Sequence, residues 1–221
     1  MNINYNTTNP RQVDQLLETE ITKLTDSSAY SFSIGSLPNA TDYVGNALIT
    51  DVGGGSLWRS DGYNWAPING SVVIYRNTTP SVAHTGNTTE TLLEEILIPG
   101  RLLGPTGGLR ITNRLNTTNN ANTKTFKVRI GTATGIGGTV VNDPQWTSNA
   151  TITCMTWIDN VGVENSQIGF NGNPIGSGTP NSWRTASINT AANFLVSITG
   201  QLSNSADSIQ VVSTTIELVR I

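Results

Sequence analysis

The chain has few charged and aromatic residues, one cysteine, one histidine and no long apolar run. Charged residues make up 12% of its 221 residues, against roughly 25% in an average soluble protein. The 12 Lys and Arg are outnumbered by 15 Asp and Glu, so the composition gives no overall attraction to nucleic acid or to an anionic membrane surface. No apolar stretch approaches the length of a membrane-spanning helix, so we expect no membrane span.

The single cysteine and the single histidine restrict the chemistry further. Cys154 has no partner for an internal disulfide, and the alternating run around it predicts a buried structural thiol. His84 lies in a polar connector, where we expect a solvent-facing loop residue rather than a catalytic base. A zinc site needs more Cys and His ligands than this chain has, and we expect no metal and no cofactor.

Three carboxylates, Asp143, Asp159 and Glu164, lie within one loop-rich stretch. A pair of carboxylates would suit a sugar hydrolase, and a cluster would suit calcium. Their spacing does not match an EF-hand loop, and Asp in such loops usually serves turn formation. We therefore expect a protein that is not an enzyme.

In place of charge the chain is rich in Asn, Ser and Thr, which make up roughly a third of it. From about Asp42 onward, short runs with a period of two alternate with Gly, Asn and Pro turns, which is typical of β-strands. The fold class we expect is mainly β: a jelly-roll-like antiparallel sandwich at 77–221, preceded by a small β-meander at 42–76 and an N-terminal arm at 1–41 with one short helix. The strands expected in the meander and the sandwich are 47–51, 56–59, 64–67, 71–75, 91–98, 109–118, 123–131, 150–158, 167–170, 183–190, 194–201 and 208–221.

The helix signal lies near the N-terminus, where Asn9 can cap a helix that begins at Pro10. Five apolar residues at helical spacing form one stripe: Val13, Leu16, Leu17, Ile21 and Leu24. A helix this short is marginal in isolation, so the stripe must pack against something else. Our hypothesis is that it binds a partner, and the alternative is that it packs on its own sandwich.

Basic residues gather between Glu95 and Asp143, where no acidic residue occurs. Four of them alternate outward on two expected strands that an Asn-rich turn connects: Arg110, Arg114, Lys127 and Arg129. If these two strands pair, the four cations form one basic face that could bind an acidic partner. A solvated face without a partner is the simpler interpretation.

The five tryptophans fall into two groups. Trp58 and Trp65 flank one turn of the expected meander, and we expect them to form its small core rather than a binding surface. Trp146, Trp157 and Trp183 are spread over the larger part of the chain. A glycan-binding platform would require exposed indoles among them.

Two stretches resemble structural proteins of tailed bacteriophages. Residues 58–70, WRSDGYNWAPING, resemble a small module of such virion proteins, and residues 91–131 are similar to their β-rich domains through the segments ILIPG, LLGP, GLRI and NNANTKT. The resemblance implies a trimeric, jelly-roll-like protein on a phage head or tail. It implies no catalytic residues.

Two positions in a virion agree with the sequence. A capsid decoration (cement) protein needs a compact β body and an arm that grips the capsid, and the N-terminal stripe supplies such an arm. The alternative is a head-fibre or tail-fibre adhesin that binds host surface glycans, although neither fibrous repeats nor a long coiled coil is visible. The first ten residues lack the pattern of a secretory signal. We expect a non-enzymatic virion protein, made in the host bacterial cytoplasm, that forms a homotrimer and binds the major capsid protein or another virion protein.

Deletion of residues 1–25 tests the role of the N-terminal stripe. If the stripe anchors the protein, the truncated chain keeps its β circular-dichroism spectrum but no longer sediments with particles, because each fully buried apolar side chain contributes about 1.5–3 kcal/mol before ordering costs. Unfolding or aggregation of the truncated chain would place the stripe in the core of the protein. Unchanged particle binding would place the anchor elsewhere.

Overall fold

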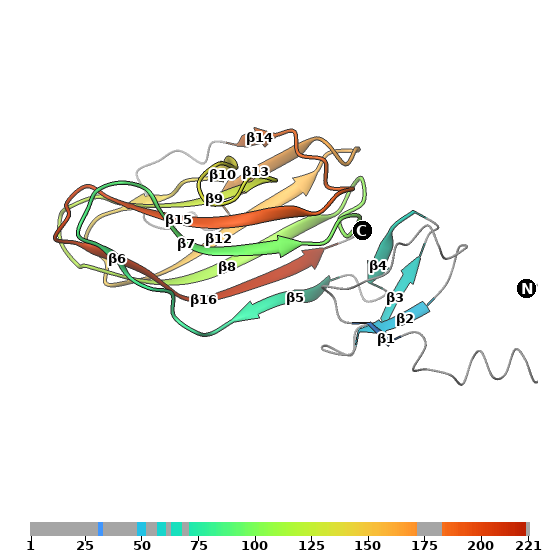
Figure 1. The fold of residues 1–221 in the computed structure, drawn as a ribbon, viewed down its shortest axis with the longest axis horizontal. Coiled ribbons are helices and arrows are strands. Elements are labelled where there is room, and N and C mark those ends of the chain that lie inside the picture. Colours follow the sequence, from blue (N-terminus) through green and yellow to red (C-terminus); the bar gives the residue numbers. More distant parts are fainter. Residues whose placement is uncertain are drawn as a thin grey trace, which may run out of the picture.

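The computed structural model describes residues 31–32, 48–51, 57–60, 63–67, 71–171 and 183–219 (Figure 1). These residues form a small four-stranded sheet and a larger sandwich made of a seven-stranded and a five-stranded sheet. The mainly β, antiparallel fold is therefore confirmed for the described part of the chain. The predicted N-terminal helix lies outside the described residues.

The small sheet contains four strands in chain order: β1 (Ser31–Phe32), β2 (Leu48–Asp51), β3 (Leu57–Ser60) and β4 (Trp65–Pro67). Trp65 lies opposite Ser60 of β3. Because Ser60 is two residues after Trp58, all three side chains point to the same face of the sheet. Both are buried, as predicted. A side-chain hydrogen bond connects this part of the chain to the sandwich, because Arg101 Nη1 donates a hydrogen bond of 3.2 Å to the backbone carbonyl of Tyr63, just before β4.

The seven-stranded sheet has the order β14–β13–β12–β8–β16–β5, and the short β6 also pairs with β16. All of its strand pairs are antiparallel. Its strands are β5 (Ser71–Asn77), β6 (His84–Thr85), β8 (Gly108–Thr117), β12 (Thr151–Asn160), β13 (Gln167–Asn171), β14 (Arg184–Ala186) and β16 (Ser208–Val219).

The five-stranded sheet has the order β10–β9–β15–β7, and β11 also pairs with β9. Its strands are β7 (Thr91–Ile98), β9 (Lys124–Gly131), β10 (Thr139–Asn142), β11 (Gln145–Trp146) and β15 (Phe194–Leu202). The edge strands β5 and β7 lie along the same side of the sandwich (Figure 1).

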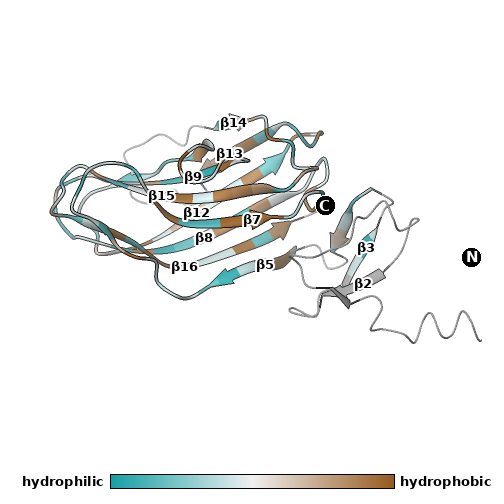
Figure 2. Cartoon of the chain, viewed as in Figure 1, coloured by the Kyte–Doolittle hydropathy of each residue, from teal (hydrophilic) through white to brown (hydrophobic). Residues whose placement is uncertain are grey.

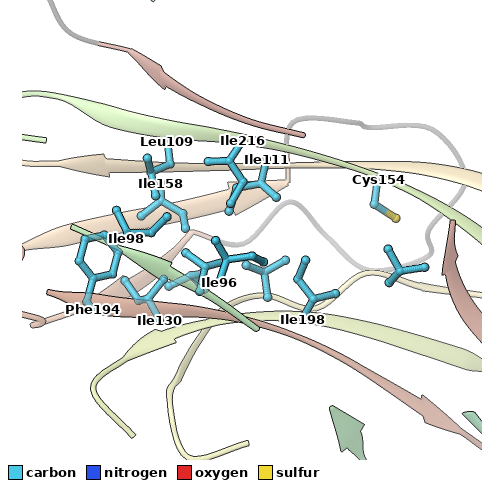
Figure 3. Packing of buried hydrophobic residues seen from close by; sticks show 14 of the residues in the cluster. Ile96, Ile98, Leu109, Ile111, Ile130, Cys154, Ile158, Phe194, Ile198 and Ile216 are labelled. Atoms are coloured by element: carbon cyan, nitrogen blue, oxygen red, sulfur yellow. The ribbon is translucent and has the colours of Figure 1, made fainter. Parts of the chain in front are cut away.

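The core lies between the two sheets, because alternate residues of each strand point inward. Apolar stretches therefore recur along the strands of both sheets (Figure 2). Figure 3 shows the two inner faces in contact, with Leu109, Ile111, Cys154, Ile158 and Ile216 from one sheet and Ile96, Ile98, Ile130, Phe194 and Ile198 from the other. The residues between them point outward and form the outer faces of the two sheets.

Two features differ from the expectations. The strand expected at 71–75 as the last of the meander is β5, which pairs with β16 and so belongs to the sandwich. His84, expected to face solvent, is buried, because it forms a two-residue strand beside β16. A strand of two residues carries too little alternation for the sequence to reveal it.

An ion-pair cluster covers part of the outer face of the five-stranded sheet. Glu90 accepts hydrogen bonds from Lys127 Nζ (2.6 Å) and from Arg129 Nε (2.8 Å) and Nη2 (2.9 Å). Thr199 Oγ1 donates a fourth hydrogen bond at 2.6 Å. Burial alone would raise the pKa of Glu90, but the hydrogen bonds from Arg129, Lys127 and Thr199 outweigh it and lower the pKa to about 2.

The low pKa of Glu90 makes the stability of the protein sensitive to acid. Because the folded-state pKa of about 2 lies below the ordinary value of 4.5, the carboxylate stabilises the fold at neutral pH, and this contribution is lost as the pH falls from 4.5 through 2. We expect Glu90→Gln to lower the free energy of unfolding by about 2 kcal/mol at pH 7. The difference should shrink toward zero near pH 2, as measured by urea unfolding at several pH values.

Glu217→Gln is the matched control, because Glu217 lies on the other sheet and its side chain makes no hydrogen bond to any described residue. It should change the free energy of unfolding by less than about 0.5 kcal/mol. An equal loss in both variants, or a Glu90→Gln difference that persists at pH 2, would contradict the ion-pair assignment.

Candidate functional site

The predicted N-terminal stripe, Val13, Leu16, Leu17, Ile21 and Leu24, lies outside the described residues. The structure therefore neither places these five side chains nor tests their role. The remaining candidate residues all lie in the sandwich.

The structure does not bring the four predicted cations together. Arg110 and Arg114 are on β8, which pairs with β12 and β16, whereas Lys127 and Arg129 are on β9, which pairs with β10, β11 and β15. The Asn-rich turn between β8 and β9 carries the chain from one sheet to the other. The two strands do not pair, so the condition for one shared basic face is not met, and the four residues do not lie on one face.

The two pairs of cations also differ in their partners. Lys127 and Arg129 both form ion pairs with Glu90, so both side chains already have a carboxylate partner. Arg110 and Arg114 are exposed on the outer face of the seven-stranded sheet.

An aromatic row crosses the outer face of the seven-stranded sheet. On β12 the inward residues are Cys154, Thr156, Ile158 and Asn160, so the residues between them face outward. Trp157 lies opposite Phe170 of β13 on one side and opposite Arg110 of β8 on the other. Trp183, immediately before β14, extends the row beyond Phe170.

The rings of this row contact one another in sequence. Trp157 and Phe170 have centroids 5.1 Å apart at an interplanar angle of 68°, an edge-to-face arrangement. Phe170 and Trp183 have centroids 6.4 Å apart and are tilted by only 30°. The Arg110 guanidinium lies 4.7 Å from the centroid of the Trp157 ring. Trp157 thus supports Phe170 and Arg110, while Trp183 is 72% exposed.

A hollow adjoins the exposed indole. It is lined by Asp159, Val161, Ile168, Phe170, Asn171 and Trp183. Burial raises the pKa of Asp159 above its ordinary value, and the nearby Arg110 charge opposes this. Gly108 lies opposite Asp159 and leaves room for its carboxylate, because a Cβ at that position would lie 2.0 Å from Asp159 Oδ1. We call Phe170, Trp183 and this hollow the platform.

The other tryptophans cannot serve as a binding surface. Trp58 and Trp65 are buried in the small sheet. Trp146 is buried as well, and its Nε1 donates a hydrogen bond of 3.3 Å to Thr117 Oγ1. Trp183 is therefore the one mostly exposed indole among the described residues.

Groups suited to catalysis are dispersed or enclosed in the part of the chain that the structure describes. Cys154 is a free, buried thiol, as predicted, and burial raises its pKa to about 12. Asp143 forms an ion pair with Arg184, whereas Asp159 lies on the outer face of β12. No group of three His, Cys, Asp or Glu side chains among the described residues is arranged to hold a metal ion. The same residues include no helix long and apolar enough to span a bilayer.

The platform has the two kinds of group that would bind an uncharged sugar ring: aromatic faces and polar side chains. Flat aromatic faces can cover the apolar side of a pyranose, while a carboxylate and an amide at the rim can bond its hydroxyls. Trp157 and Trp183 stand out in the sequence as possible binding residues, but the sequence does not show that Phe170 lies next to them. The alternation of apolar and polar residues in 150–158 and 167–170 could have shown that Trp157 and Phe170 both face outward. Only the strand register shows that they are neighbours.

Neither a protein-family model nor a curated protein sequence matches the chain. Among solved structures, the CBM2 module of the Lactobacillus casei BL23 phage J-1 evolved Dit is similar at a TM-score of 0.35 and 10% identity, covering 69% of this chain and 97% of that one. The legume lectin-like domain from Entamoeba histolytica gives 0.31 and 8%, covering 67% and 90%. The lectin I from Ulex europaeus, in complex with the methyl glycoside of α-L-fucose, gives 0.29 and 8%, covering 85% and 95%. At these values the three structures assign neither a family nor a function to this chain.

Proposed function

We propose that the chain is a non-enzymatic, glycan-binding virion protein of the adhesin type, and that it binds sugars on the platform. The observation that carries this proposal is the exposed Trp183 indole, which lies beside Phe170 over a hollow edged by Asp159. Large exposed aromatic side chains on a soluble protein mark binding sites, because their solvation is costly. The mixture of rings and polar rim groups favours a sugar over a purely apolar ligand.

The neighbouring side chains hold the platform in one shape before any ligand arrives. The Trp157 and Phe170 rings pack edge to face, and Arg110 lies over the Trp157 ring. A surface arranged in advance loses less conformational entropy on binding. Trp157 is thus a positioning residue, and Trp183 and Phe170 are the side chains that contact the sugar.

The capsid-cement function is supported by other parts of the chain. It depends on the N-terminal stripe, on a homotrimer and on contact with a major capsid protein. All three come from the sequence and from the resemblance to phage virion proteins. A decoration protein does not require an exposed aromatic platform, whereas an adhesin does, and this favours the adhesin of the two virion positions. That the protein is part of a virion is also proposed here, together with glycan binding.

Replacement of Trp183 by Ala tests the proposal. We expect wild-type protein to bind a subset of bacterial surface glycans on an array, and Trp183→Ala to weaken the binding of those glycans by at least about tenfold in calorimetric titration, because the apolar contact area is lost. Folding should be unchanged, since the side chain is exposed.

Leu97→Ala is the matched control, because Leu97 is 60% exposed on β7 of the other sheet. It should bind the same glycans with wild-type affinity. Absence of glycan binding by the wild-type protein, or equal affinity of the Trp183→Ala and wild-type proteins, would refute the proposed function.

A further inference from the structure

A second hollow lies on the same outer face of the seven-stranded sheet. Two cross-strand pairs border it, because Arg114 lies opposite Thr153 and Asn116 lies opposite Thr151. All four residues are exposed and face outward. Val212, the extra residue of the bulge in β16, closes one side of the hollow. Apart from Val212, its outward lining consists of guanidinium, hydroxyl and amide groups, and it contains no carboxylate.

Arg114 and the exposed Arg76 of β5 differ from the other cations of the sandwich, and of these two only Arg114 lines this hollow. Lys127 and Arg129 are paired with Glu90, Arg184 is paired with Asp143, and Arg110 lies against Trp157. The Arg114 guanidinium makes no hydrogen bond, ion pair or ring contact with any described residue. A free guanidinium beside the Thr151 hydroxyl and the Asn116 amide is an arrangement suited to a carboxylate or a phosphate.

We propose that the hollow around Arg114 is a subsite for an acidic group of the bound glycan, either a carboxylate or a phosphate. This inference rests on the proposed function and specifies its ligand: an extended, acidic oligosaccharide rather than a single neutral sugar. The neutral ring lies on the platform, and a unit farther along the glycan carries the acidic group to Arg114.

Strand geometry sets the separation between the two contacts. Arg110 lies in the same cross-strand row as Trp157 and Phe170 and is four residues from Arg114 on β8, so the platform and Arg114 are at least about 13 Å apart along the strand direction. That distance exceeds a single sugar ring, so one monosaccharide cannot reach both places. A chain of sugars that crosses β12 can do so.

The charges on this face also fix the direction of the glycan. At the platform end, Asp159 and Glu217 lie on either side of β8 close to Arg110, so negative charge predominates there. At the other end Arg114 faces Ser213 and Thr153, and no carboxylate lies opposite it. An acidic group is therefore repelled from the platform end and attracted to the Arg114 end.

The test compares wild-type protein with Arg114→Gln and Arg76→Gln. Arg76 is an exposed arginine on β5 of the same sheet and does not line the hollow, so it is the matched control. The probes are three oligosaccharides with one backbone: a uronic-acid form, its carboxyl-reduced neutral form and a phosphate-bearing form. The affinity of each protein for each probe is measured by calorimetry at low and high salt.

We expect wild-type protein and Arg76→Gln to bind one acidic form about tenfold more tightly than the neutral form, and this preference to shrink at high salt. Arg114→Gln should bind both forms with the affinity that the wild-type protein has for the neutral form. The acidic form that gains affinity identifies the group as a carboxylate or a phosphate.

Two results would overturn the inference and leave the proposed function standing. In the first, the wild-type protein binds the neutral form as tightly as both acidic forms, and Trp183→Ala abolishes this binding. In the second, Arg114→Gln keeps the full acidic preference. If none of the three probes and no glycan on the array binds wild-type protein, the proposed function fails, and this inference fails with it.

Discussion

The candidate site depends on the register of β12 between β8 and β13. In this register Trp157 lies opposite Phe170 on one side and Arg110 on the other. Because side chains alternate along a strand, a slip of one residue would turn Trp157 into the core and bring Thr156 and Ile158 to the surface. The inner face prevents this slip, since Ile158 packs in the core and Thr156 Oγ1 accepts a hydrogen bond of 2.7 Å from Asn142 Nδ2. Core packing thus positions the outer aromatic row.

Sequence alone predicted the strands that carry long alternating runs, but it did not predict which strands pair. The run expected at 91–98 matches β7 residue by residue, because alternation is a local property. The neighbours of β8 are set by contacts between residues far apart in the chain: Leu109 lies opposite both Ile158 and Leu218. Adjacent strands joined by a short turn usually pair, which is why β8 and β9 were expected in one sheet. The platform could not be derived for the same reason, since its rings come from three strands or strand ends.

Compensation of charge, rather than the number of charges, decides where this protein can attract a ligand. The four basic residues lie close together in the sequence, but the structure places Arg110 and Arg114 on one sheet and Lys127 and Arg129 on the other. Glu90 precedes β7 and is 37 residues from Lys127 in the chain, and it still forms ion pairs with both Lys127 and Arg129 on the five-stranded sheet. On the other sheet, Arg110 is engaged by an aromatic ring, and Arg114 is left without a partner among the described residues. A weakly acidic protein can thus keep a cationic side chain available for an acidic ligand.

The most direct test of the central claim is an NMR titration of the tryptophan indole N–H groups with a glycan that binds on the array. The five indoles are internal reporters, because Trp183 is exposed on the platform while Trp58, Trp65 and Trp146 are buried elsewhere. Glycan binding at the platform predicts a large, saturable shift of the Trp183 indole signal, a smaller one for Trp157 and none for the three buried indoles. Saturable shifts of the small-sheet indoles with an unchanged Trp183 signal would contradict the account.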